Sequence, residues 1–152
     1  MKIQGTRFAT IEYEADDIIA LPDGLVGFPR SRRFLIVNNK EGSPFRWLQS
    51  IEEPHLAFLV TEPSKFGLAY TPEFPDKVAE ALDLEPTTPA LMFTTAAIPP
   101  GLPHDLTLNL AAPIVINALT RTGMQVVLED PAYTMRHRVF DEKSPQGAGA
   151  AA

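Results

Sequence analysis

The residues best equipped for chemistry lie in the stretch NALTRTGMQ, residues 117–125, which carries two amides, a guanidinium and two hydroxyl groups. Such groups can bind a polar ligand or stabilise charge that develops in a reaction. Apolar runs flank the stretch at 113–116 and 126–128, and these runs predict two strands. Gly123 suits the turn between them, because glycine readily supplies the positive φ that hairpin turns commonly require. We therefore predict a hairpin turn that faces a partner protein rather than a catalytic site. Its candidate binding residues are Asn117, Arg121 and Gln125.

No other group of residues has the spacing of an enzyme or metal site. The chain has no cysteine, which excludes thiolate ligands and a cysteine nucleophile. It has no serine in a G-x-S-x-G motif and no glycine-rich phosphate loop. The adjacent acids Asp16–Asp17 and Glu52–Glu53 are candidates for metal binding, but neighbours on a strand face opposite sides. The histidines lie far apart in the sequence, at His55, His104 and His137. We expect no catalytic residue, no cofactor and no metal.

Composition narrows the class of partner. The net charge is −6 and the pI is near 5.0, so the chain should repel phosphate backbones and attract basic proteins. The basic cluster of Arg30, Arg32 and Arg33 is expected to be a solvated turn, with direct RNA binding as the alternative. The chain contains no apolar run of the roughly 18 residues that a membrane helix needs and no apolar signal core near Met1. We therefore expect a cytoplasmic protein that binds neither nucleic acid nor membrane.

The elements that must position these residues are short. There are 15 prolines, and proline is confined to turns, edges and helix starts. Apolar residues alternate with polar ones in many segments, and turn residues separate them. A helix is predicted over 75–84, with Val78, Ala79 and Leu82 on one face. The turn at 27–29 is expected to open one helical turn through Arg33. Strands are expected at 2–4, 8–13, 18–21, 34–37, 46–51, 56–61, 90–97, 106–110, 114–117 and 124–129.

This pattern predicts the fold class. Many short strands with one helix are typical of an antiparallel sandwich or a closed barrel. We predict an all-β, mainly antiparallel, small β-barrel-like domain with one short helix, covering residues 1–143. The tail at 144–152, SPQGAGAAA, cannot bury enough apolar surface to order itself and is expected to be disordered.

Aromatic residues offer a second kind of binding surface. Trp47 is expected to belong to the core, although both faces of its strand carry apolar residues. Phe66, Tyr70 and Phe74 fall in a predicted loop, where an apolar patch more readily marks a partner site.

Four segments together make the sequence resemble the flagellar assembly factor FliW family. They are DGLVGFP (23–29), PFRWLQSIEEPHLAFLVTEP (44–63), LNLAAPIVINALTRTGMQVVLED (108–130) and YTMRHRV (133–139), in the order of the family. The resemblance implies a cytoplasmic, non-enzymatic, β-barrel-like protein. It also implies two partners: flagellin before export, and the RNA-binding translational repressor CsrA. The loop IPPGLPHD (98–105) is less acidic than is usual in the family, and the tail has no counterpart there.

If these are the partners, each candidate binding residue has an expected role. Arg121 and Gln125 would supply hydrogen bonds, and Asn117 would orient them. The apolar anchors would be Phe45 and Trp47, and the acids that meet positive charge would be Glu52 and Glu53. The alternative is an enzyme on a small barrel, or a domain that binds flavin or a sugar, which would require a deep pocket with convergent polar groups.

Overall fold

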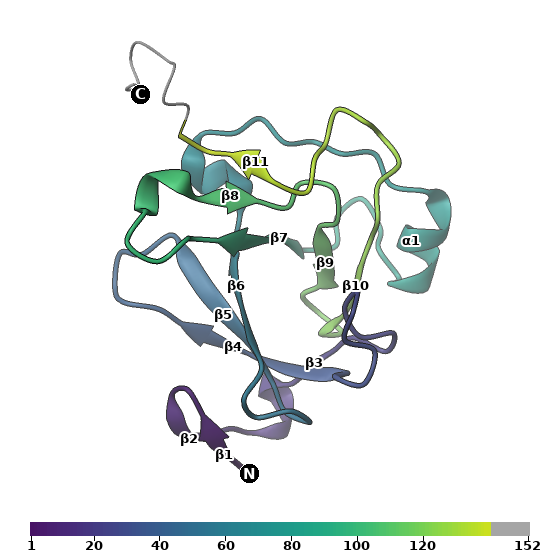
Figure 1. Cartoon of the computed structure of the whole chain (residues 1–152). Helices are drawn as coiled ribbons and strands as arrows, with labels where there is room; N and C mark the ends of the chain where they lie inside the picture. The colour runs from purple at the N-terminus through teal and green to yellow at the C-terminus, as the bar shows by residue number, and fades with distance from the viewer. Residues whose placement is uncertain (141–152) are drawn as a thin grey trace.

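The computed structural model describes residues 1–140 and is built mainly of strands (Figure 1). Within that part there are eleven strands and one α-helix; the sequence predicts the helix and ten of the strands but not β11. The tail predicted at 144–152 lies outside the described residues. The strands are β1 (Lys2–Thr6), β2 (Ala9–Glu12), β3 (Ile19–Ala20), β4 (Arg33–Asn38), β5 (Phe45–Ser50), β6 (Ala57–Thr61), β7 (Ala90–Ala97), β8 (Thr107–Leu108), β9 (Ile114–Asn117), β10 (Thr122–Gln125) and β11 (His137–Arg138). The helices are α1 (Asp76–Ala81) and the 3-10 turns η1 (Ala15–Asp17), η2 (Pro63–Phe66) and η3 (Pro103–Asp105).

The main sheet closes into a barrel. Its nine strands follow the order β11-β8-β7-β6-β5-β4-β3-β10-β9, and an additional β7–β9 pairing closes the ring. The long strand β7 makes this possible, because Ala90–Phe93 pair with β9 and the residues after them pair with β6 and β8. Every pairing is antiparallel except the single β10–β3 contact. The predicted mainly antiparallel, barrel-like fold is therefore confirmed.

Alternation of side chains on β9 connects the barrel to α1. Ile114 and Ile116 enter the barrel core, while Val115 packs outside against Val78 and Leu82 of the α1 region. This is the two-sided burial expected of a strand that is covered on both faces. The buried members of the barrel core are Ile19, Leu21, Leu25, Phe34, Leu48, Val60, Phe93, Ile114 and Ile116.

The helix α1 is shorter than the predicted span of 75–84 and ends in a left-handed cap. Asp83 has a φ of 54°, and the amide of Leu84 donates to the carbonyl of Ala79 over 2.9 Å, which is the bond pattern of a Schellman motif. Val78 and Leu82 are buried as predicted, but Ala79 is exposed. Ala79 therefore does not belong to the buried face.

The segment after the DGLVGF turn contains no helical turn, so that prediction is wrong. Leu25 and Phe28 instead form an isolated antiparallel bridge around Gly27, whose φ is 86°. The chain then enters β4 directly at Arg33, which is a strand residue. Proline at 29 and the tight bridge account for this, because the residue before a proline disfavours helical backbone.

The first two strands form a separate two-stranded sheet, drawn in purple beside the N-terminus in Figure 1. Phe8 in its turn packs edge-on against Trp47, with ring centroids 5.6 Å apart. The guanidinium carbon of Arg7 lies 4.2 Å from the centroid of the Trp47 ring, which is within cation–π range. Trp47 is half-buried beneath this hairpin, so the expectation that it belongs to the core is wrong.

No helix within residues 1–140 has the length and apolar character required to cross a membrane.

Candidate partner-binding surface

Asn117 lies at the end of β9, is only 1% exposed, and has all its polar atoms engaged. Its Nδ2 donates to the carbonyl of Leu82 over 2.7 Å and, more weakly, to that of Asp83 over 3.4 Å. Its Oδ1 accepts from the amides of Leu119 and Thr120 over 2.8 and 3.2 Å. These bonds join the end of α1 to the β9–β10 turn. They suit the predicted orienting role, and direct contact of Asn117 with a partner stays a prediction.

The β9–β10 turn takes its positive φ from Arg121, at 58°, so the prediction that Gly123 supplies it is wrong. Gly123 lies within β10 and is needed there for a different reason. A Cβ at this position would lie 2.5 Å from the carbonyl oxygen of Val115 and 2.8 Å from Cγ1 of Ile116. The close approach of β9 therefore leaves no room for a side chain.

The Arg121 side chain reaches across to the N-terminal part of the chain. Its Nη2 donates to the carbonyl of Asp17 over 3.1 Å, and its own carbonyl accepts from the amide of Ala20 over 2.9 Å. Its Nε is buried and has no hydrogen-bond partner in the part of the chain that the structure describes. Arg121 thus holds η1 and β3 against the turn.

Gln125 bridges two segments that are far apart in the sequence. Its Oε1 accepts from the amide of Val26 over 2.8 Å, and its Nε2 donates to the carbonyl of Ala112 over 3.0 Å. The side chain therefore fixes the DGLVGF turn beside the start of β9. Its predicted role in binding a partner would require one of these bonds to be shared or broken.

Glu52 is held by the start of β4. Its Oε1 accepts from the amides of Arg32 and Arg33, each over 3.0 Å, and its Oε2 forms an ion pair with Nε of Arg33 over 2.6 Å. Partial burial alone would raise the pKa of Glu52, but the hydrogen bonds from Arg33 and Arg32 outweigh it and lower the pKa from its ordinary value. Conversely, the bond to Glu52 raises the pKa of the Arg33 guanidinium.

Glu53 belongs to a small network of hydrogen bonds with Ser31 and Ser50. Its carboxylate accepts from the hydroxyl of Ser31, which also lies 2.7 Å from the hydroxyl of Ser50. The Ser50 hydroxyl oxygen accepts from the amide of Glu53 over 3.0 Å, and both serines are fully buried. Nothing in the sequence around Ser31 indicates this role, because only the folded pairing of β4 with β5 brings the two serines together.

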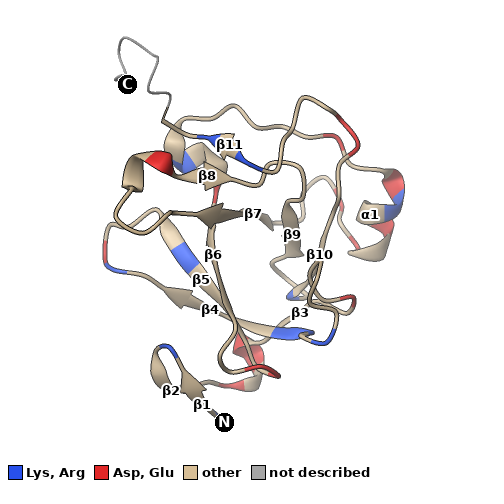
Figure 2. Ribbon diagram, in the orientation of Figure 1, with Lys and Arg blue, Asp and Glu red and all other residues tan. Residues whose placement is uncertain are grey.

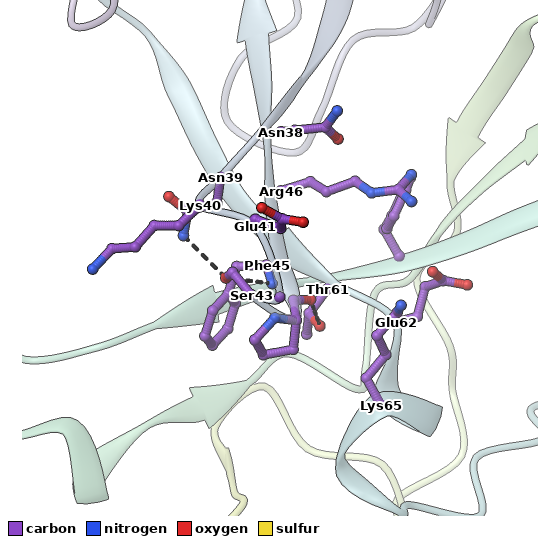
Figure 3. Close-up of a pocket in the computed structure, with 13 residues that line it drawn as sticks. Asn38, Asn39, Lys40, Glu41, Ser43, Phe45, Arg46, Thr61, Glu62 and Lys65 are labelled. Carbon is purple, nitrogen blue, oxygen red and sulfur yellow. Dashed lines mark hydrogen bonds between the residues drawn. The ribbon is translucent and has the colours of Figure 1, made fainter.

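Phe45 and Trp47 lie near the opposite end of β5. Phe45 packs against Phe66, with ring centroids 5.7 Å apart, beside the pocket of Figure 3. That pocket has a volume of about 420 Å³ and a rim of mixed charge. The rim carries Lys40, Glu41, Arg46, Glu62 and Lys65. Both aromatic residues remain partly accessible on the outer face of the barrel.

The structure brings some of the predicted binding residues together and keeps others apart. Ala20 of β3 pairs with Arg33 on one side and with Thr122 on the other. The Glu52–Arg33 pair is therefore about 10 Å, or two strand spacings, from the β9–β10 turn. Phe45 and Trp47 lie toward the other end of β5. The seven predicted residues therefore do not form one continuous site.

The loop aromatics also separate. Tyr70 is buried, and its hydroxyl donates to the carbonyl of Leu110, so it is not part of an exposed patch. Burial raises the pKa of Tyr70, and nearby Tyr133 adds to the effect. Phe74, in contrast, lines a groove between the segment 71–78 and the segment 124–133.

Sequence analysis does not identify this groove. It has a volume of about 790 Å³ and combines apolar and acidic side chains. One wall follows β10 beyond Gln125: the amides of Val126 and Leu128 donate to the carbonyls of Pro113 and Ala111 over 2.8 and 2.7 Å. The segment 124–129, which is predicted as a strand, is thus paired as far as Leu128, although β10 ends at Gln125. The sequence signal available for this wall is the apolar run at 126–128.

Within residues 1–140, no cluster of histidine, aspartate and glutamate side chains has the arrangement to hold a metal ion.

Comparison with known proteins gives one consistent family. The sequence model of the FliW protein family matches residues 2–139. The flagellar assembly factor FliW of Magnetococcus marinus is 42% identical over 130 residues, covering 86% of this chain and 80% of that protein. The flagellar assembly factor FliW of Natranaerobius thermophilus is 35% identical over 150 residues, covering 99% of both chains.

A solved structure agrees. The crystal structure of a flagellar assembly factor FliW superposes with a TM-score of 0.84 at 32% identity, covering 95% of this chain and all of the other. The family match over residues 2–139 includes β5, β9 and β10. This chain belongs to the FliW family of flagellar assembly factors.

Proposed function

We propose that this chain is a cytoplasmic, non-enzymatic regulator that binds flagellin and antagonises the RNA-binding translational regulator CsrA. Through these two partners it would couple flagellin secretion to flagellin translation. The observation that carries the proposal is the family match over residues 2–139, since the relatives that cover the whole chain are flagellar assembly factors.

Charge supports the choice of a basic partner. The chain carries a net charge of −6, and an RNA-binding protein must present positive charge to phosphate. Opposite charges raise the rate of association and favour correct pairing. Among the described acids, Glu129 and Glu73 lie in the groove beside Phe74 and Val127. This surface could therefore offer apolar contact and negative charge together.

The regulation follows from linked equilibria. Two partners that exclude each other compete for a limited number of copies, so abundant flagellin occupies the protein and secretion frees it for CsrA. Raising a free partner to about 100 times its dissociation constant contributes about 2.7 kcal/mol of linkage, which is enough to change the occupant.

Isothermal calorimetry with purified flagellin and purified CsrA tests the proposal. We expect saturable binding to each, with the affinity for CsrA falling as salt rises because exposed charges are screened. Absence of heat with both proteins up to tens of micromolar would refute it. A small molecule that copurifies with the chain, or that makes the sample absorb visible light, would instead favour a ligand-binding or enzymatic barrel.

A further inference from the structure

The segment that follows β10 has one paired edge and one open edge. The amides of Val126 and Leu128 donate inward to the carbonyls of Pro113 and Ala111, in the segment that precedes β9, over 2.8 and 2.7 Å. In an antiparallel ladder, the residues between such pairs direct their N–H and C=O groups to the other side. The backbone groups of Val127 and Glu129 therefore point away from the barrel. No residue in the described part, 1–140, forms a hydrogen bond with them.

The Val127 side chain is also directed to solvent and is 63% exposed. An exposed strand edge with an apolar side chain is a template for pairing with another chain, and proteins normally cover or blunt it. Val26, held beside this edge by the bond from its amide to Gln125, is 65% exposed. Two exposed valines thus lie on the DGLVGF turn and on the open edge.

Negative charge surrounds this edge. The adjoining groove is lined by three acids, Glu73, Glu129 and Asp130, and α1 begins at a fourth, Asp76. Among the described residues that line this groove, the one basic residue is Lys77. Acidic segments are visible on α1 and on neighbouring loops in Figure 2. The apolar part of the groove is formed by Phe74, Val78, Met124, Leu128 and Tyr133. A segment bound here would meet an apolar strip with a net negative rim.

We propose that the open edge at 127–129 binds an extended segment of a partner protein as an added strand, one that carries basic side chains beside apolar ones. The backbone of Val127 and Glu129 supplies the pairing, the groove beside Phe74 accepts apolar side chains, and the acidic rim selects positive charge. This inference rests on the proposed function, and the occupant we assign is a segment of the basic partner, CsrA.

An added strand differs from a docked helix in one testable respect. A helix satisfies its own backbone bonds and would use only side chains of the groove, whereas an added strand needs the amide of Val127. Val127→Pro removes that amide but leaves the inward bonds of Val126 and Leu128 in place. Proline is tolerated at an edge position whose N–H faces solvent. Val127→Thr is the matched control, because it changes the side chain and keeps the amide.

We expect Val127→Pro to weaken the calorimetric affinity for CsrA about tenfold or more, since tenfold corresponds to about one hydrogen bond. Val127→Thr should weaken it less than about threefold. The double variant Glu73→Gln/Glu129→Gln should lose about fivefold at low salt and less at high salt. Its matched control, Glu12→Gln/Glu41→Gln, neutralises exposed acids outside the groove and should bind like the wild type.

Amide hydrogen exchange on the unaltered chain gives a measurement that does not depend on a variant folding. The amides of Val127 and Glu129 should exchange rapidly in the free protein and become protected when CsrA saturates it. The inference fails if wild-type binding is intact but these amides stay unprotected, or if both Val127 variants bind alike. Protection by flagellin alone would overturn the assigned occupant. Binding of neither protein would overturn the proposed function together with the inference.

Discussion

Replacing the buried Asn117 by alanine should lower the free energy of unfolding by more than the loss of a side-chain contact on the protein surface would. The side chain makes two short hydrogen bonds, 2.7 Å to the carbonyl of Leu82 and 2.8 Å from the amide of Leu119. Each contributes about 0.5–1.5 kcal/mol net, and a buried group left without a partner adds about 1–3 kcal/mol. Leu82 is buried whereas Leu119 is exposed, so only the Leu82 carbonyl would be stranded. Together these contributions come to about 2–6 kcal/mol.

That loss is a large share of the roughly 5–15 kcal/mol that stabilises a typical domain. Urea unfolding followed by circular dichroism should show a lower midpoint with an unchanged slope, and the Tm should fall by about 5–20 °C. Asn109→Ala is the control, because Asn109 contributes one bond of 3.1 Å, to the amide of Ala111, and should cost about 1 kcal/mol or less. If Asn117→Ala unfolds within about 0.5 kcal/mol of the wild type, its bonds do not hold α1 to the hairpin.

Three further changes test other parts of the structure. Gly123→Ala would place a Cβ 2.5 Å from the carbonyl oxygen of Val115 and should cost about 2–3 kcal/mol in thermal melts; an unchanged Tm would contradict this close approach. Because the pKa of Glu52 is lowered, the stability it contributes is present above its ordinary pKa of 4.5 and is lost as pH falls through the folded pKa. Glu52→Gln should therefore flatten the acid limb of a stability curve, and a limb parallel to the wild type would show that the Arg33 pair does not matter. The raised pKa of Tyr70 means that stability is lost as pH rises above about 10. Tyr70→Phe should reduce that alkaline loss in a denaturation series, and an equal loss would indicate that another group causes it.

The strands could be predicted because their signal is local. Short segments rich in apolar residues, bounded by turn residues, identify β5, β6, β7 and β9 to within about one residue. Ile114 and Val115 lie on opposite faces of β9 and belong to different hydrophobic clusters, as the period of two along a strand requires. Closure of the ring by β7 and β9 depends on contacts between distant segments, and no local pattern distinguishes a barrel from a sandwich.

The errors have identifiable physical causes. The sequence predicts that Gly123 supplies a positive φ, but glycine is required there by the close approach of β9, and Arg121 takes the left-handed conformation instead. Trp47 was expected in the core, because the sequence does not show that the N-terminal hairpin folds back over the outer face of β5.

The hydrogen-bond partners of the candidate binding residues could not be predicted from the sequence either. The predicted polar residues are present at the strand ends, but Asn117, Gln125 and Glu52 already bond to segments between 13 and 99 residues away. Sequence spacing cannot reveal such partners. Val127 falls within the apolar run 126–128 of a predicted strand, and the sequence does not show that its outer edge is open. That depends on the absence of a neighbouring strand within residues 1–140.

The central claim is that this protein acts through which partner occupies it. A displacement titration tests this most directly: the chain is saturated with labelled CsrA, flagellin is added, and the fraction of CsrA still bound is followed by fluorescence anisotropy. We predict that flagellin releases CsrA, with an apparent Kd for CsrA that rises as free flagellin exceeds its own Kd. A ternary complex in which flagellin leaves the affinity for CsrA unchanged would contradict the account.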